Sequence, residues 1–228
     1  MNKKIIGIIG LLLLVCGLGF LFYTYMPNSL KLKRDERKLY KQGMAKDDFM
    51  DFDKLMAENP HVRFWVKGEG VNTPIMESGG EDVDMYSNVD MHGNLTDTPP
   101  AYLPYHIEED AANIIAFGKV NDDNKGALSS MLTQPSKKLT VYERDKLYNC
   151  ELVGMGKFYP DYQAEFLQSY DLNSEGYSKF LDDVNNQFKT KLVSSERVFM
   201  FVPNYSLDSE SGVLLYRVVD SKIAQDKK

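Results

Sequence analysis

Uncharged, mostly apolar residues fill the chain from Ile5 to Met26 without a break. As a helix, a run of about 20 such residues is long enough to cross the hydrocarbon core of a bilayer. Two lysines precede the run, and it ends at Pro27 without the small residues that a signal-peptide cleavage site needs. The pattern therefore predicts a cytoplasmic tip and a retained transmembrane helix over residues 1–28.

The next segment, residues 29–57, is polar and rich in helix-forming residues. Apolar side chains recur there at helical spacing from Phe49 to Met56, ahead of the helix-ending pair Asn59-Pro60. We expect a helical stalk that carries the following domain and packs an amphipathic helix against it.

Residues 58–228 carry short β-type runs separated by Gly, Asn, Asp and Pro. Many short strands in one domain indicate a mostly β fold, either a barrel or a sandwich. One helix interrupts them, because apolar residues follow helical spacing from Tyr177 to Phe188. The expected strands are 62–66, 71–76, 101–103, 114–117, 139–143, 148–154, 198–202 and 213–219.

Charge limits the partners of this chain. The formal net charge is −6, and it becomes −8 when Lys3 and Lys4 are left out. A negative domain of this kind does not bind nucleic acid or an anionic cell-wall polymer through its bulk charge. The acidic clusters at 81–84 and 122–123 are interpreted as solvated loop charges.

Cysteine and histidine usage points to no cofactor. Cys16 lies in the apolar run, which leaves Cys150 without a partner for a disulfide in the soluble part. The histidines do not follow the spacing of metal ligands, and we expect no metal site. They are His61, His92 and His106.

Several segments, taken together with their order and spacing, resemble the class B sortases, a family of Gram-positive transpeptidases. An Asn-Pro pair precedes a tryptophan-bearing strand at 59–66, a strand with a proline follows at 71–76, and another strand ends in Phe-Gly at 113–118. Further matching segments are 85–88, 99–103, 127–132 and the helix at 175–190. The resemblance covers roughly residues 50–220.

This resemblance implies a sortase-like eight-stranded β-barrel with one helix inserted between its late strands. It also implies a groove for a sorting-signal peptide, with Phe117, Tyr205, Ser206 and Arg217 as groove residues. The lysines and arginines at 31–41 would by themselves favour a cytoplasmic C-terminal side. Because the family faces outward, we expect the C-terminal domain to be extracellular.

The chain departs from the family at the three positions that carry its chemistry. The family histidine follows a Tyr-Gly pair, and Lys119 stands at that position here. The family cysteine ends a late strand, where this chain has Asn204, and the family arginine is replaced by Val213. Arg217 lies four residues further along, and the role of the arginine is not transferred to it.

These replacements remove the expected chemistry. An exposed lysine titrates near 10.4, about four units above a histidine, and exchanges protons poorly at neutral pH. An amide nitrogen does not replace a thiolate as nucleophile. The sequence therefore predicts no catalytic residue among Lys119, Asn204 and Val213.

Three alternatives stay open at this stage. Cys150 lies within a predicted strand and is interpreted as a packed core residue, but it is also a candidate nucleophile. Ser206 is a candidate serine nucleophile with His106 as its base. The resemblance would make Lys119 and Asn204 point at each other across the implied active site. They would then be a hydrogen-bonded pair, two unrelated residues or, beside a nearby buried carboxylate, the partners of an internal isopeptide bond.

The function predicted first is that of a membrane-anchored, extracellular and catalytically inactive sortase-like protein. It would act as an adaptor or accessory factor in surface-protein or pilus assembly, with sorting-signal peptides, pilus or surface subunits, or an active sortase as partners. The alternative is a divergent class B sortase that retains or replaces its activity. A third hypothesis is an envelope structural protein whose groove is unused.

Overall fold

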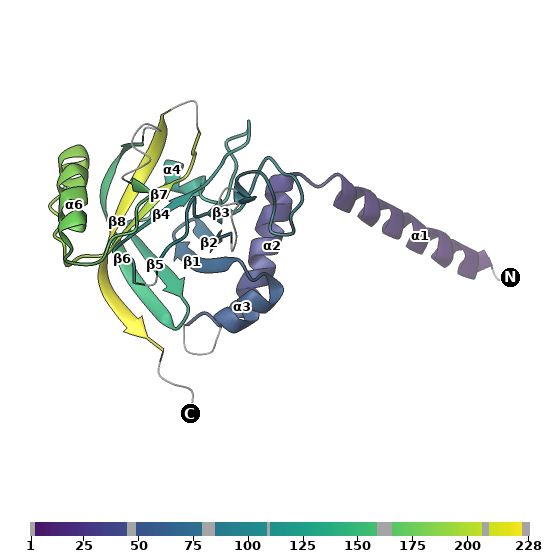
Figure 1. The fold of residues 1–228 in the computed structure, drawn as a ribbon. Coiled ribbons are helices and arrows are strands. Elements are labelled where there is room, and N and C mark those ends of the chain that lie inside the picture. Colours follow the sequence, from purple (N-terminus) through teal and green to yellow (C-terminus); the bar gives the residue numbers. More distant parts are fainter. Residues whose placement is uncertain are drawn as a thin grey trace.

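The computed structural model describes residues 3–44, 49–78, 85–108, 110–158, 166–206 and 210–224. Its helices are α1 (Lys3–Thr24), α2 (Asn28–Gly43), α3 (Phe52–Glu58), η1 (Met85–Ser87), α4 (Ser130–Thr133) and α6 (Glu175–Phe188). Its strands are β1 (Val62–Gly68), β2 (Val71–Met76), β3 (Ala101–Tyr102), β4 (Asn113–Phe117), β5 (Lys138–Glu143), β6 (Lys146–Phe158), β7 (Val198–Val202) and β8 (Ser211–Ile223). Figure 1 shows these elements in sequence colours.

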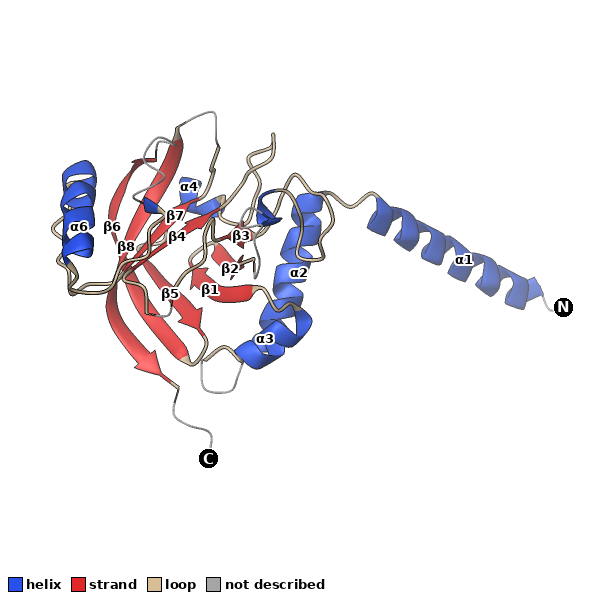
Figure 2. Ribbon diagram, viewed as in Figure 1, coloured by secondary structure: helices blue, strands red, loops and turns tan. Residues whose placement is uncertain are grey.

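The strands close into a barrel in the order β1-β2-β3-β4-β7-β8-β6-β5. Figure 2 shows this barrel with the helices around it. The sequence predicted either a barrel or a sandwich, and the structure is an eight-stranded barrel. Most neighbours are antiparallel, but β4 and β7 run parallel in register from Asn113↔Val198 to Phe117↔Val202. Parallel strands end on the same side of a sheet, so the residues that follow Phe117 and Val202 lie next to each other at the same end of the barrel.

β4 and β7 are buried at every position. An antiparallel strand with one face in water would alternate apolar and polar residues, whereas these two strands read as continuous apolar runs. The aromatic side chains of Phe199 and Phe201 stack inside the fold, and Phe201 meets Tyr216 of β8 edge to face. This cluster forms the centre of the barrel core.

The helix inserted between β6 and β7 confirms the prediction from periodicity. Ser174 caps its first turn by accepting a hydrogen bond from the Tyr177 amide, and Lys189 ends it in the left-handed region with φ 55°. The hydroxyl of Tyr177 lies within hydrogen-bond distance of the carbonyl oxygens of Glu196 (2.6 Å) and Ala112 (3.1 Å), which share its single proton. The helix is thereby tied to the segments that lead into β4 and β7. Its buried residues are the five predicted ones, Tyr177, Phe180, Leu181, Val184 and Phe188.

The described parts of residues 29–57 include α2 and α3, and the apolar run that starts at Phe49 becomes helical only from Phe52. α2 packs directly on the barrel. Leu32, Glu36 and Leu39 face inward from α2, and the Glu36 carboxylate accepts a 2.5 Å hydrogen bond from the Thr73 hydroxyl on β2. The ring of Tyr40 lies 5.7 Å from that of Trp65, the buried tryptophan of β1. The helix that follows α1 is therefore part of the domain surface.

α1 extends away from the barrel (Figure 1), and its side chains from Ile8 to Phe22 are exposed. The helix expected for the first apolar run is present. Within the described residues, however, none of the helices combines the length and the apolar character that crossing a membrane requires. The transmembrane helix predicted over residues 1–28 is thus not confirmed.

Candidate functional site

The candidate site lies where β4 and β7 end side by side. The amide of Gly118 donates to the Val202 carbonyl, and the amide of Tyr205 donates to the Gly118 carbonyl, each at 2.8 Å. The backbone around Asn204 therefore runs against Gly118. A Cβ at position 118 would lie 3.0 Å from the Pro203 carbonyl oxygen, a tight contact that favours glycine there. The two chain segments that carry Lys119 and Asn204 meet, as the resemblance implied.

Asn204 is held by the start of β8. Its Oδ1 accepts a 2.9 Å hydrogen bond from the Gly212 amide, and its carbonyl accepts one of 3.1 Å from the Ser211 hydroxyl. Val213 follows Gly212 and is buried opposite Gly156 of β6. The side-chain amide of Asn204 thus acts as a structural acceptor, and Val213 contributes packing without charge.

Lys119 has its partners in a different loop. Its Nζ donates to the Oδ1 of Asn88 at 2.9 Å and to the carbonyl of Ser87 at 3.4 Å. The Lys119 ammonium group and the Asn204 amide therefore point to separate acceptors and donors. Sequence reasoning gave no role to Ser87 and Asn88, because only the folded chain brings them to Lys119.

Aromatic rings fill the space beside these residues. The ring of Tyr205 stacks on that of Phe117 with 4.0 Å between centroids, and Phe158 of β6 meets Phe117 edge to face at 5.6 Å. Phe117 is itself buried, while Tyr205 is partly exposed. Two of the predicted groove residues thus lie at the site, and they pack on each other.

A pocket of about 410 Å³ adjoins Lys119. Asp97 lines it, and hydrogen bonds, first of all from Asn28, hold the pKa of the Asp97 carboxyl below its usual value. Asp122 and Asp123 are exposed on its rim. Over the part of the chain that the structure describes, no group of three or more His, Cys, Asp or Glu side chains is placed to hold a metal ion. The other acidic cluster, 81–84, lies outside the described residues.

Arg217 lies away from this site. It pairs with Val198 at the start of β7, four residues before Val202, which corresponds to about 13 Å along a strand. Its guanidinium group forms ion pairs with Glu151 and Glu196. The structure therefore gives Arg217 a role in fastening β8 to its surroundings, and its position does not support the groove role predicted for it.

The alternative nucleophiles are placed as follows. Cys150 is buried on β6, and burial raises the pKa of its thiol to about 12. A thiol in this state is neither ionised nor reachable at neutral pH. The Ser206 amide donates to the Ser211 hydroxyl near the site, whereas the Nδ1 of His106 lies 3.0 Å from Glu77. We infer no Ser206–His106 pair from this arrangement.

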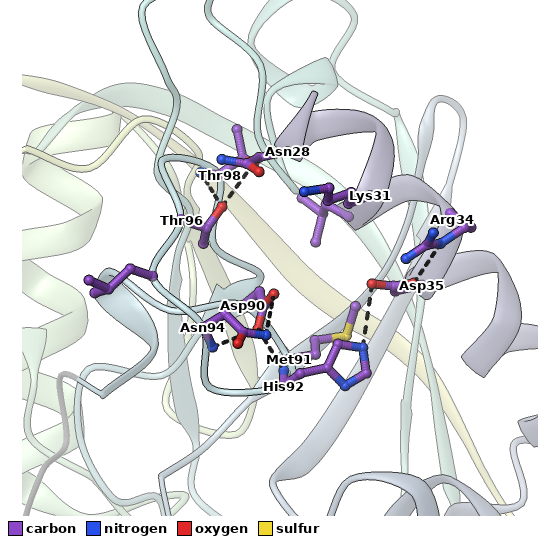
Figure 3. Close-up of a pocket in the computed structure, with 12 residues that line it drawn as sticks. Asn28, Lys31, Arg34, Asp35, Asp90, Met91, His92, Asn94, Thr96 and Thr98 are labelled. Atoms are coloured by element: carbon purple, nitrogen blue, oxygen red, sulfur yellow. Dashed lines mark hydrogen bonds and ion pairs between the residues drawn. The ribbon is translucent and has the colours of Figure 1, made fainter. Parts of the chain in front are cut away.

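A second, smaller pocket of about 210 Å³ lies between α2 and the loop before β3 (Figure 3). There the Nε2 of His92 lies 3.5 Å from Asp35, and the Nε of Arg34 donates to the same carboxylate at 3.0 Å. Sequence reasoning gave His92 no role as a metal ligand and missed this juxtaposition. The contact between His92 and Asp35 connects α2 to the loop.

No model of a protein family matches the chain, and no curated protein is significantly similar to it in sequence. Solved structures do match. The sortase B of Clostridium perfringens aligns over 74% of this chain and 100% of its own, with 21% identity and a TM-score of 0.62. A Staphylococcus aureus sortase B–substrate complex aligns over 85% and 96%, with 13% identity and a TM-score of 0.69.

A third example is the sortase B of B. anthracis in complex with AAEK1. It aligns over 88% of this chain and 99% of that one, with 16% identity and a TM-score of 0.63. The structural neighbours are class B sortases, and the closed barrel of this chain has the sortase-like fold that the sequence predicted. At these identities the similarity concerns the fold alone.

Proposed function

We propose that this chain is a sortase-like protein that binds or scaffolds without carrying out transpeptidation. The observation that carries the proposal is the position of Asn204 at the end of β7, with its Oδ1 bonded to the Gly212 amide. A carboxamide is not a nucleophile toward a peptide carbonyl, so acyl transfer would need another residue.

The nearby chemistry supports the same proposal. Lys119 follows β4, and its ammonium group is bound to Asn88. Cys150, the remaining cysteine of the barrel, is buried within the core. The described part of the site therefore offers neither an accessible thiol nor an imidazole paired with one, and both are needed for cysteine-type acyl transfer.

The partners follow from the fold by analogy. A barrel of this kind would receive an extended sorting-signal peptide, a pilus or surface subunit, or an active sortase. The protein would serve as an adaptor or accessory factor in surface-protein assembly. We place it at the cell membrane with the barrel outside, attached through α1, whose described side chains are apolar and exposed. Membrane fractionation with protease protection of intact cells tests this location.

The function is tested with the full-length chain in detergent and a library of quenched sorting-signal peptides, read for cleavage and for binding in the same wells. Binding without cleavage is the expected result. Cleavage would contradict the proposal. If that cleavage survived Cys150→Ala but was lost in Ser206→Ala, the alternative of a divergent sortase with a replaced nucleophile would be established.

One observation favours a second candidate, an envelope structural protein with an unused groove. Tyr205 covers Phe117 at the site, as a ring filling a binding groove would. In that case the native chain binds no peptide in the library, and Tyr205→Ala, which uncovers Phe117, does not gain binding either. Peptide binding that appears only in Tyr205→Ala would instead indicate a groove that Tyr205 closes.

A further inference from the structure

The C-terminal part of β8 has an open edge. β7 pairs with β8 only between Val198↔Arg217 and Phe201↔Leu214, and the Val218 amide then donates to the Arg197 carbonyl at 2.9 Å. β8 continues to Ile223, with β6 on one side. Figure 1 shows this end of β8, in yellow, running on toward the C-terminus. Among the described residues, no strand pairs with the other edge of residues 219–223.

A hollow borders this part of β8. A hollow of about 390 Å³ is lined by Ser221, Lys222 and Ile223 of β8 and by Leu172 and Ser195 from the segments flanking α6. Val219 and Ile223 leave 52% and 72% of their surface exposed. An uncovered strand edge with exposed β-branched side chains is a template for pairing with a further strand.

The sequence of this edge is complementary to itself. In an antiparallel pair of two copies centred on Ser221, Asp220 of each chain faces Lys222 of the other, and Val219 faces Ile223. Opposite charges directly across a strand pair stabilise it, and like charges destabilise it. Parallel pairing in register would place Asp220 against Asp220, so the charges select the antiparallel arrangement.

The charges are available for such pairing. Within the described part of the chain no hydrogen bond or ion pair involves the side chain of Lys222, and the Asp220 carboxylate accepts one 3.3 Å hydrogen bond from Asn149. We propose that two copies of this protein associate through residues 219–223 of β8, in an antiparallel pair centred on Ser221. The Val218 amide is already bonded to Arg197 and β8 ends at Ile223, so the paired run has five residues and the association is weak.

Cysteine cross-linking tests the register in the full-length chain, in a Cys16→Ser background. Mild oxidation is expected to give a covalent dimer of Ser221→Cys, because the two copies of residue 221 face each other. Asp220→Cys alone and Lys222→Cys alone should stay monomeric, since identical positions lie beyond the roughly 7 Å that a disulfide bridges. Mixing these two variants should give the dimer again. No dimer with Ser221→Cys, or equal cross-linking of all variants, would overturn the proposal.

Charge reversal tests the pairing without a covalent bond. Asp220→Lys or Lys222→Asp makes two attractive pairs repulsive and should weaken association about tenfold in sedimentation analysis. The double variant Asp220→Lys with Lys222→Asp restores both opposite-charge pairs and should return to within about threefold of the native chain. Unchanged Trp65 fluorescence checks that each variant is folded. Failure of the double variant to recover would contradict the self-complementary edge.

Discussion

Tyr205 stacks face to face on Phe117 at the end of the barrel, with 4.0 Å between ring centroids and 17° between ring planes. Phe117 ends β4, and Tyr205 comes three residues after β7 ends, so this contact joins the two strands at the candidate site. The backbone bond from the Tyr205 amide to the Gly118 carbonyl holds the stack in place. Tyr205, the residue next to Asn204, thus holds the ends of β4 and β7 together.

Removing this ring should destabilise the barrel. Tyr205→Ala is expected to lower the free energy of unfolding by about 1–3 kcal/mol, because it removes the stacked pair and part of its buried surface. Tyr205→Phe keeps the ring and should stay within about 1 kcal/mol of the native chain. Urea unfolding followed by Trp65 fluorescence measures both. Equal stability of Tyr205→Ala and the native chain would show that the stack contributes nothing.

Asn204 should matter as a hydrogen-bond acceptor. Asn204→Ala leaves the Gly212 amide without its side-chain partner, and we expect a loss of about 1 kcal/mol in the free energy of unfolding. Asn204→Asp keeps an acceptor of similar shape and should lose less. The comparison uses the same urea titration. A larger loss for the aspartate than for the alanine variant would mean that the amide nitrogen carries the interaction.

Lys119 and Asn204 should not form an isopeptide bond. The Nζ of Lys119 is bound to Asn88, and the Oδ1 of Asn204 accepts from Gly212, so neither side chain has the other as its partner. The intact mass of the purified chain should therefore equal that of its sequence. A deficit of one ammonia that disappears in Lys119→Arg would contradict this prediction.

Cys150 should be inert in the folded protein. Burial raises the pKa of its thiol to about 12 from 9.0, which lowers the thiolate fraction at neutral pH roughly 1,000-fold. In Cys16→Ser, where Cys150 is the only thiol, a maleimide should label the native chain at least roughly 100-fold more slowly than the urea-unfolded chain. Rapid labelling of the native chain would reopen the possibility of a reactive Cys150.

The docking of α2 should depend on pH through Glu36. The carboxyl is buried against β2, and this burial raises its pKa to about 7, although Lys33, the Thr73 hydroxyl and Arg37 act in the opposite direction. When protonated, Glu36 can donate to the Thr73 hydroxyl, which then can donate to the Pro74 carbonyl 3.3 Å away. When ionised, it leaves that carbonyl without this donor and places a charge in the core.

Because the folded-state pKa lies above the reference value of 4.5, the stabilisation is complete below pH 4.5 and is lost as the pH rises through about 7. Relative to Glu36→Gln, the native chain should lose about 2–3 kcal/mol of unfolding free energy between pH 5 and pH 8. Urea titrations at both values measure this difference. A pH profile identical to that of Glu36→Gln would show that Glu36 does not titrate in this range.

Local patterns in the sequence determined much of this fold. The apolar spacing from Tyr177 to Phe188 specified the buried face of α6, and the apolar runs specified β4 and β7, because periodicity depends only on neighbours along the chain. β6 and β8 extend beyond their predicted ends at 148–154 and 213–219. Most of their outer residues are polar or exposed, although Leu147 and Phe158 are buried, and pairing between the two strands keeps these ends extended.

Tertiary structure alone decided the contacts at the site. The order of residues placed Lys119 and Asn204 after two strands, but the parallel register of β4 and β7 brought them together. Folding also brings Lys119 into a hydrogen bond with Asn88 and Asn204 into one with Gly212. It places Arg217 at the far end of β7. Such partners lie many residues apart, and their distances depend on how the barrel closes. The sequence therefore predicted which residues stand at the ends of β4 and β7, and the closed barrel decided which partners those residues hold.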